Sequence, residues 1–294
     1  MKGIILAAGR GTRLYPMTKP VCKPLLPIYD KPLIYYPLSL LISSGIREVL
    51  VIVPPGEVPT FEALFGDGSS FGMQISYAVQ TVARGIADAL LIGREFVGDD
   101  DVCLVLGDNI FHSPTLPQVM KAAAEGNQGA TVFGIYQEDP RAFGVVEFDE
   151  NGKVISLEEK PLEPKSNYIV PGVYFYDHRV MDIAANLTPS ARGELEITDV
   201  NLAYLSTGDL HVVKLPEDTI WLDAGTTDSL LAAAQTIQKI QSETGLLIGC
   251  IEELAYDQGW ITRTQLKGLG NELAKTFYGR HLLHYPDVES LVKC

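Results

Sequence analysis

Short apolar segments alternate with longer helical ones through the first half of the chain, and this alternation limits the possible folds more than any other feature. Short β-branched runs bounded by Gly, Pro or Asp predict strands at 3–7, 48–53, 75–79 and 102–106. Helices are predicted at 33–44, 58–65, 85–96 and 116–125. Strands that alternate with helices form parallel βαβ units, whose ligands bind beyond the carboxyl ends of the strands. Motifs that directly follow a strand are therefore the first candidates for function.

The second half of the chain has more closely spaced strands and then a helical end. Strands are predicted at 130–135, 143–149, 153–158, 172–176, 210–215 and 219–222. Helices are predicted near 178–187, 194–206, 227–243, 251–257, 263–276 and 276–284. No linker or internal repeat is visible, so we expect an α/β, Rossmann-like fold: a mixed, mostly parallel sheet flanked by helices. Residues 1–226 form its main domain, and residues 227–294 form a helical C-terminal appendage that makes oligomer contacts.

Composition argues against several classes of protein. The chain carries 23 Lys and Arg against 37 Asp and Glu, a formal net charge of −14, whereas sequence-tolerant nucleic-acid binding needs a basic surface. No apolar run reaches the roughly 18 residues that span a bilayer. The cysteines form no C-x-x-C pair and no zinc pattern; they are Cys22, Cys103, Cys250 and Cys294. We expect a reduced, cytoplasmic protein that binds neither nucleic acid nor membrane.

A glycine loop, Ala8-Gly9-Arg10-Gly11-Thr12-Arg13-Leu14, follows the first predicted strand. A Gly-x-Gly turn there lets backbone N–H groups approach an anion closely. The loop is not a dinucleotide fingerprint, because Leu14 stands where the third glycine is needed, and it lacks the Gly-Lys-Ser/Thr of a Walker loop. Arg13, Lys19 and Lys23 fall close together in an acidic chain and indicate a clamp for a polyphosphate. The alternative is an ordinary turn with solvated basic side chains.

A series of motifs then resembles the sugar-1-phosphate nucleotidyltransferase family, and within it the glucose-1-phosphate thymidylyltransferases, over essentially the whole chain. The motifs are the glycine loop, Lys23-Pro24-Leu25-Leu26-Pro27, Leu104-Val105-Leu106-Gly107-Asp108-Asn109, Phe143-Gly144-Val145-Val146-Glu147-Phe148, Leu157-Glu158-Glu159-Lys160-Pro161, Gly172-Val173-Tyr174-Phe175-Tyr176-Asp177, Arg192-Gly193-Glu194-Leu195-Glu196-Ile197-Thr198 and Trp221-Leu222-Asp223. The resemblance implies an enzyme that joins dTTP and glucose 1-phosphate into dTDP-glucose and pyrophosphate, as a homotetramer. It also implies a nucleotide-binding half at about 1–110 and a sugar-binding half at about 111–226. UTP or another base, another hexose 1-phosphate, and a non-catalytic sugar-nucleotide sensor are the alternatives.

Asp108 and Asp223 each follow a predicted strand, at the ends where α/β sites are built. Two carboxylates together with phosphate oxygens are a common way to hold Mg²⁺, and the resemblance implies Mg²⁺ at these two positions. For Asp223 the alternative is a helix N-cap. His112 is interpreted as a loop residue and Cys22 as a packing residue, because no nucleophilic triad accompanies either of them.

The resemblance assigns the remaining candidate residues to the two substrates. The catalytic set is Arg13, Lys23, Asp108, Lys160 and Asp223. The nucleotide-binding set is Ala8, Gly9, Gly11, Thr12, Arg13, Lys23, Gln80, Gly85 and Asp108. The sugar-phosphate set is Gly144, Glu159, Lys160, Gly172, Arg192 and Trp221, the last either on the sugar or in the core.

Three departures from the family pattern affect specificity and regulation. Ala8 replaces a glycine usual in thymidylyltransferases, and the segment 81–89 replaces a proline-rich link and a Gly-Leu-Ala-Gln-Ala run, so the base stays open between dTTP and UTP. Glu217 and Asp257 stand where relatives carry arginines of a second nucleotide site. We therefore expect either no inhibition by dTDP-rhamnose at that site or a response to a different ligand there, unless other cations such as Lys214 or Arg263 substitute.

Overall fold

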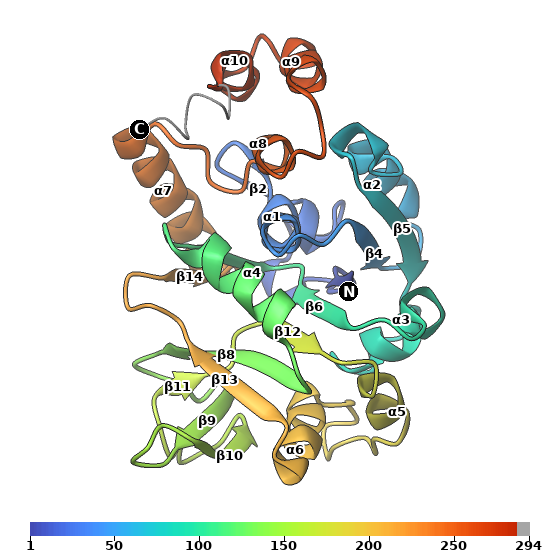
Figure 1. Ribbon diagram of the computed structural model, residues 1–294, viewed down its shortest axis with the longest axis vertical. Coiled ribbons are helices and arrows are strands. Elements are labelled where there is room, and N and C mark those ends of the chain that lie inside the picture. The colour runs from blue at the N-terminus through green and yellow to red at the C-terminus, as the bar shows by residue number, and fades with distance from the viewer. Residues whose placement is uncertain (287–294) are drawn as a thin grey trace.

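The computed structural model describes residues 1–286 and contains a ten-stranded sheet with helices on both faces (Figure 1). Its order is β10-β9-β11-β8-β12-β6-β1-β4-β5, with β13 paired to β8. The strands are β1 (Lys2–Leu6), β4 (Glu48–Val53), β5 (Gln74–Val79), β6 (Val102–Leu106), β8 (Ala130–Tyr136), β9 (Gly144–Phe148), β10 (Val154–Glu159), β11 (Tyr168–Ile169), β12 (Val173–Tyr176) and β13 (Leu210–Lys214). Two further pairs join β2 (Pro27–Ile28) to β3 (Lys31–Pro32) and β7 (Asn109–His112) to β14 (Ile220–Asp223).

The helices match the predicted positions to within a few residues at each end. They are α1 (Tyr35–Ser43), α2 (Val58–Phe65), α3 (Asp88–Val97), α4 (Leu116–Gly126), α5 (Val180–Ala185), α6 (Ile197–Thr207), α7 (Thr227–Thr244), α8 (Ile251–Asp257), α9 (Arg263–Glu272) and α10 (Phe277–His284). Short 3₁₀ turns occur at Thr12–Leu14, Lys23–Leu25 and Ser69–Phe71. In the part of the chain described here, no helix is both long and apolar enough to cross a membrane.

The N-terminal strands confirm the predicted parallel arrangement. β1 lies between β4 and β6, β5 lies beside β4, and all three pairs are parallel. Their carboxyl ends therefore meet at one edge of the sheet. The glycine loop after β1, Gln80 after β5 and Asp108 after β6 all start from this edge.

Strands of the second half extend the sheet in mixed directions, as expected for an α/β fold of this kind. β12 pairs antiparallel with both β6 and β8, and β13 runs parallel to β8. The β9, β10 and β11 strands complete a lobe at the far end of the molecule from α9 and α10 (Figure 1).

Side chains that alternate along each strand build two hydrophobic cores, one on each face of the sheet. Ile5 belongs to the core covered by α1, α2, α4 and α8, and neighbouring Ile4 belongs to the core under α3, α5 and α6. Both side chains are fully buried, and burial of an isoleucine contributes about 1.5–3 kcal/mol. Leu266 and Leu282 of the C-terminal helices share the first core, so these helices pack directly on the main domain.

The sequence missed the short strands β2, β3, β7 and β11, because two to four residues carry no recognisable period. The helix predicted over 85–96 begins at Asp88, since Gly85 has a φ of 105° that a helix does not accommodate. The helix predicted to 276 ends at Glu272. Residues 287–294 of the predicted appendage, with Cys294, lie outside the described residues, and the boundary at residue 226 stays a prediction.

Candidate active site

Two adjoining cavities open at the carboxyl edge of the parallel strands, and Ile86 lines both. The loop cavity measures about 600 Å³ and is lined by Leu6, Ala8, Gly9, Arg10, Thr12, Pro54, Pro55, Gln80, Thr81, Val82, Ala83, Gly85, Ile86 and Glu194. The carboxylate cavity measures about 220 Å³, and its polar lining consists mainly of Arg13, Asp108, Asn109, Glu159, Lys160, Thr198, Asn201, Trp221 and Asp223. Five residues of the predicted nucleotide set line the loop cavity: Ala8, Gly9, Thr12, Gln80 and Gly85. Arg13 and Asp108 of the same set line the carboxylate cavity with most of the predicted sugar residues, and Gly11 and Lys23 line neither.

Not every residue of the glycine loop faces the loop cavity, because Gly11 packs against Lys23 instead. Gly11 has a φ of 60°, a conformation that favours glycine. A Cβ atom at Gly11 would lie 3.0 Å from the Lys23 Cβ and 3.0 Å from Thr18 Cγ2. Thr18 Oγ1 also donates a 2.6 Å hydrogen bond to the Gly11 carbonyl. Gly11 therefore positions the lysine, while Ala8, Gly9 and Thr12 line the loop cavity.

Lys23 joins the two predicted metal ligands. Its Nζ lies 2.6 Å from Asp108 Oδ2 and 3.7 Å from Asp223 Oδ1, and its side chain is only 7% exposed. Asp108 stands between β6 and β7, Asp223 ends β14, and β14 pairs antiparallel with β7 in a register that sets Asp223 opposite Asn109. This small two-stranded sheet brings together two carboxylates that are far apart in the sequence.

Asp223 is not a helix cap. Thr226 caps α7, in a reciprocal capping box with Ser229. Burial raises the pKa of Asp223, as does the Asp108 charge, while Lys23 and Arg13 oppose the shift. A Cβ atom at Gly225 would lie 2.8 Å from Asp223 Oδ2 and 3.3 Å from Arg13 Nη2, so this glycine, which the sequence analysis missed, permits their close approach.

The donor set suits a divalent metal of the magnesium type. Among residues 1–286 no three His, Cys, Asp or Glu side chains gather into a metal cluster. Mg²⁺ is usually held by one or two carboxylates together with substrate phosphates and waters. Asp108 and Asp223, both about one third exposed and facing one cavity, match that requirement.

Asn109 is a second residue that the sequence analysis left out of the site. Its Nδ2 donates a 2.9 Å hydrogen bond to Asp108 Oδ1, and its Oδ1 accepts a 2.7 Å bond from Trp221 Nε1. Trp221 packs edge-on against Phe143 at 5.2 Å between ring centroids and lines the carboxylate cavity. Asn109 thus connects the tryptophan to the carboxylate, and its place directly after the Gly-Asp pair was the available signal.

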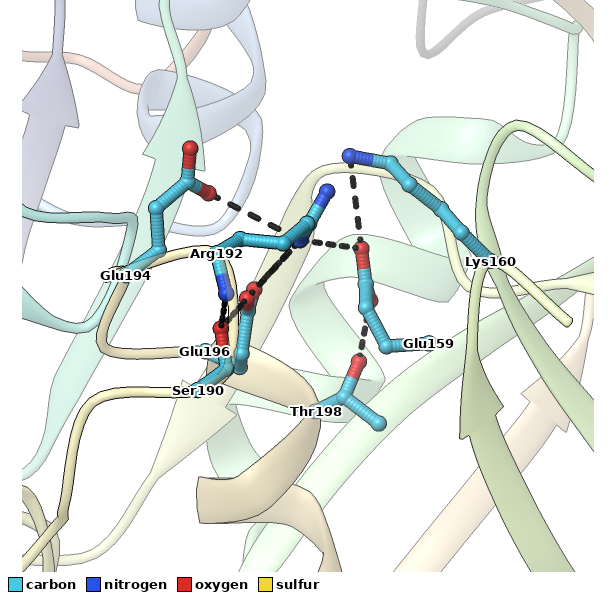
Figure 2. Close-up of polar contacts among 7 residues, drawn as sticks. All are labelled: Glu159, Lys160, Ser190, Arg192, Glu194, Glu196 and Thr198. Atoms are coloured by element: carbon cyan, nitrogen blue, oxygen red, sulfur yellow. Dashed lines mark hydrogen bonds and ion pairs between the residues drawn. The ribbon is translucent and has the colours of Figure 1, made fainter.

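Figure 2 shows three polar side chains of the carboxylate cavity, Glu159, Lys160 and Thr198, with the polar cluster around Arg192 beside them. Glu159 Oε2 accepts a 2.6 Å bond from Thr198 Oγ1, and Lys160 Nζ lies 3.5 Å from Glu159 Oε1. Lys160 has a φ of 46°, an uncommon conformation for a side chain of this size. Strain of this kind tends to occur at functional positions.

Arg192 lies outside the lining of the carboxylate cavity, although the sequence analysis placed it on the sugar phosphate. Its Nη2 lies 2.8 Å from each Glu196 oxygen and 3.3 Å from Glu159 Oε1. The hydrogen bond with Glu196 raises the pKa of Arg192. Glu194 Oε2 lies 3.6 Å from the same Nη2, so the arginine pairs with three glutamates beside the cavity (Figure 2).

Gly144 and Gly172, which the sequence analysis assigned to the sugar phosphate, both line the carboxylate cavity. Gly172 also has a packing role, since a Cβ there would lie 2.6 Å from Leu106 Cγ, and its carbonyl accepts a 2.9 Å bond from the Leu106 N–H. Burial raises the pKa of Cys22 to about 12, which keeps this thiol protonated and unreactive. His112 ends β7, and burial lowers its pKa.

The glycine loop lines one cavity, and the carboxylate pair lines the adjoining cavity together with the cations Arg13 and Lys160. Such a site is suited to join a polyphosphate to a second anionic substrate. A profile of the nucleotidyl transferase family matches residues 2–240. The chain is 52% identical over 284 residues to glucose-1-phosphate thymidylyltransferase of Neisseria gonorrhoeae, covering 97% of this chain and 99% of that protein. It is 52% identical over 289 residues to the enzyme of that name in Mycolicibacterium smegmatis, covering 98% and 100%.

Solved structures agree with the family. A Bacillus anthracis structure assigned as a glucose-1-phosphate thymidylyltransferase, in complex with a sucrose, superposes with a TM-score of 0.74 at 42% identity, covering 80% of this chain and 94% of that chain. The chain belongs to the nucleotidyl transferase family and, within it, to the glucose-1-phosphate thymidylyltransferases. Enzymes of this family generally use a divalent metal ion.

Proposed function

We propose that this chain transfers a thymidylyl group from dTTP to glucose 1-phosphate and releases pyrophosphate, and that the product dTDP-glucose feeds deoxysugar synthesis of the rhamnose type. The observation that carries the proposal is the Asp108–Lys23–Asp223 group, whose two carboxylates line the carboxylate cavity next to the loop cavity. The relatives that share about half of their residues with this chain carry the name of that activity.

The chemistry needs no enzyme nucleophile. The phosphate of glucose 1-phosphate is already anionic, so its oxygen attacks the α-phosphorus of dTTP directly while the bond to pyrophosphate breaks. The enzyme has to bring two anions together and neutralise the charge that develops on the leaving pyrophosphate. The buried Cys22 thiol and the partly buried His112 side chain take no part in such a reaction.

The cations of the site divide between the substrates. Arg13 and Lys23 hold the triphosphate, with Ala8, Gly9, Gly11 and Thr12 supplying the loop around it. Lys160 holds the sugar phosphate, and Glu159, Gly144, Gly172 and Trp221 surround the hexose. Arg192 belongs to the same phosphate set, and it reaches the phosphate by exchanging part of its Glu159 and Glu196 contacts. Asp108 and Asp223 hold Mg²⁺, which when bound supplies charge stabilisation to the phosphates.

The base is assigned to Gln80 and Gly85 in the loop cavity. Thymine is the favoured base, because the similar enzymes named above are thymidylyltransferases. A non-catalytic sensor is disfavoured by the full set of carboxylates and cations. We also assign the chain to the cytoplasm and to a homotetramer, with contacts made by the C-terminal helices.

One assay tests the proposed reaction. Pyrophosphate release is measured with glucose 1-phosphate and Mg²⁺ against dTTP, UTP, CTP, ATP and GTP in separate reactions. The highest kcat/KM is expected with dTTP. No release with any of the five, or a clear preference for another nucleotide, contradicts the proposal.

A further inference from the structure

Gln80, which lines the loop cavity, belongs to a hydrogen-bond chain that is centred on the buried carboxylate of Asp88. Gln80 Nε2 donates a 2.8 Å bond to Asp88 Oδ2, and Arg84 Nη2 lies 2.6 Å from Asp88 Oδ1. Asp88 is 1% exposed and Gln80 is 7% exposed. Each oxygen of the carboxylate therefore has a separate partner.

The backbone holds this chain in place. Leu195, just before α6, accepts a 3.2 Å bond from the Ala87 N–H and donates a 2.6 Å bond to the Arg84 carbonyl. Between them, Gly85 lies so close that a Cβ atom would stand 2.4 Å from the Leu195 carbonyl oxygen. The start of α3, and with it Asp88, is thereby anchored to a separate part of the chain.

The Gln80 side-chain amide has an oxygen and an NH₂ group of similar size, but the oxygen accepts hydrogen bonds and the NH₂ group donates them. A carboxylate in an ion pair with arginine only accepts hydrogen bonds, so the Gln80 end that faces Asp88 must be the NH₂ group. Gln80 lines the loop cavity, whereas Asp88 does not. The amide oxygen is the end left for the cavity, and it is an acceptor.

We propose that Asp88, held by Arg84, is a positioning residue that fixes the Gln80 amide with its oxygen toward the nucleobase. This inference rests on the proposed function, since it takes Gln80 to read the base. An acceptor at this position suits a base with a ring N3–H, as in thymine or uracil, and rejects cytosine, whose N3 is itself an acceptor. Asp88 thus contributes to specificity without touching the substrate.

The test compares two substrates that match except at N3 and C4: dTTP and 5-methyl-dCTP. The variant Asp88→Asn offers both a donor and an acceptor to Gln80, so neither orientation of the amide is fixed. We expect the ratio of kcat/KM for dTTP over 5-methyl-dCTP to fall at least about tenfold. The KM for glucose 1-phosphate should stay within about twofold of wild type, a split that a general loss of structure would not produce.

A second variant and a control complete the experiment. Arg84→Gln removes the cation of a side chain that is 58% exposed but keeps an amide NH₂ group that can donate to the buried Asp88 carboxylate. It should lower the same ratio, by less than Asp88→Asn. The control is Asp177→Asn. In the wild type the Asp177 carboxylate also pairs with an arginine, Arg179, and accepts a hydrogen bond from the Tyr204 hydroxyl, but it lies outside both cavities. The ratio of this variant should equal that of the wild type.

The outcomes separate the two proposals. A wild-type enzyme that does not use dTTP overturns the proposed function and the role of Gln80 with it. A wild-type enzyme that prefers dTTP, with an unchanged ratio in folded Asp88→Asn, overturns only the positioning role. If Asp88→Asn does not fold, an unchanged ratio in Arg84→Gln overturns it instead.

Discussion

The Lys23 ammonium donates a 2.6 Å hydrogen bond to Asp108, 85 positions away in the sequence. The same ammonium lies 3.7 Å from Asp223, so one buried cation offsets the repulsion between the two carboxylates. Because Lys23 contacts both carboxylates, they stay close together in the lining of the cavity where the phosphates are proposed to react.

Lys160→Ala should raise the KM for glucose 1-phosphate roughly tenfold or more while changing the KM for dTTP less. The reason is the loss of a charge-assisted bond to the sugar phosphate, a class of bond that contributes about 1.5–3 kcal/mol. Steady-state kinetics with each substrate varied in turn would measure both values.

Lys165→Ala is the matched control for Lys160→Ala. Lys165 is similarly exposed and pairs with Glu158 at 2.7 Å, but it lines neither cavity. Its kinetic constants should equal those of the wild type. Equal rises in both KM values for Lys160→Ala would show that this lysine does not serve the sugar phosphate.

Gly85→Ala should destabilise the fold and weaken nucleotide binding. A side chain at a φ of 105° costs about 1–3 kcal/mol, and the new Cβ would also press on the Leu195 backbone. Gly45→Ala has a similar φ of 77° with open space around it, and so isolates the backbone strain. Chemical denaturation of both variants is the measurement. A smaller loss of stability for Gly85→Ala than for Gly45→Ala would contradict the packing argument.

Glu252→Gln should stabilise the protein at pH 8 and leave it nearly unchanged at pH 4. Burial raises the pKa of Glu252 in the folded state, whereas an unfolded glutamate titrates near about 4.3. The folded state therefore holds its proton more tightly, and stability falls as the pH rises from the unfolded pKa through the folded one. Glutamine retains an oxygen that can accept the Tyr278 hydroxyl bond and carries no charge.

Melting temperatures of Glu252→Gln at the two pH values give the answer, with exposed Glu272→Gln as the control. Each kcal/mol gained should shift the melting temperature by roughly 2–4 °C. A gain of the same size at pH 4 and pH 8 would rule out the titration of Glu252 as its cause.

Micromolar dTDP-rhamnose should not inhibit the enzyme noncompetitively. Glu217 and Asp257 replace the arginines that the family resemblance places at a second nucleotide site, and anions there repel a pyrophosphate. Lys214 does not substitute freely, because its ammonium lies 4.2 Å from the Phe148 ring centroid and 4.7 Å from that of Tyr168. Initial rates over a dTDP-rhamnose titration would show the effect; noncompetitive inhibition at micromolar concentration would contradict it.

Much of the fold could be predicted because the strongest sequence signals are local. β1, β4, β5 and β6 are apolar runs whose ends the flanking residues mark, and Asp108 was found because it follows such a run. Contacts across the chain have no local signal. The bond between Asn109 and Trp221 joins residues 112 positions apart and depends on the register of β7 with β14. The Gln80–Asp88 bond depends on the irregular segment 81–87, of which residues 85–87 were predicted as helix.

The most direct test of Asp108 and Asp223 as the transfer centre is pyrophosphate release by Asp108→Asn and Asp223→Asn with dTTP, glucose 1-phosphate and Mg²⁺. Asp228→Asn, on the exposed first turn of α7, is the control and should match the wild type. Because the lost charge stabilisation is comparable to the loss of one catalytic donor, each site variant should turn over on the order of 10² times more slowly or worse while its melting temperature shows a folded protein. Turnover close to that of the wild type in either folded variant would contradict the account.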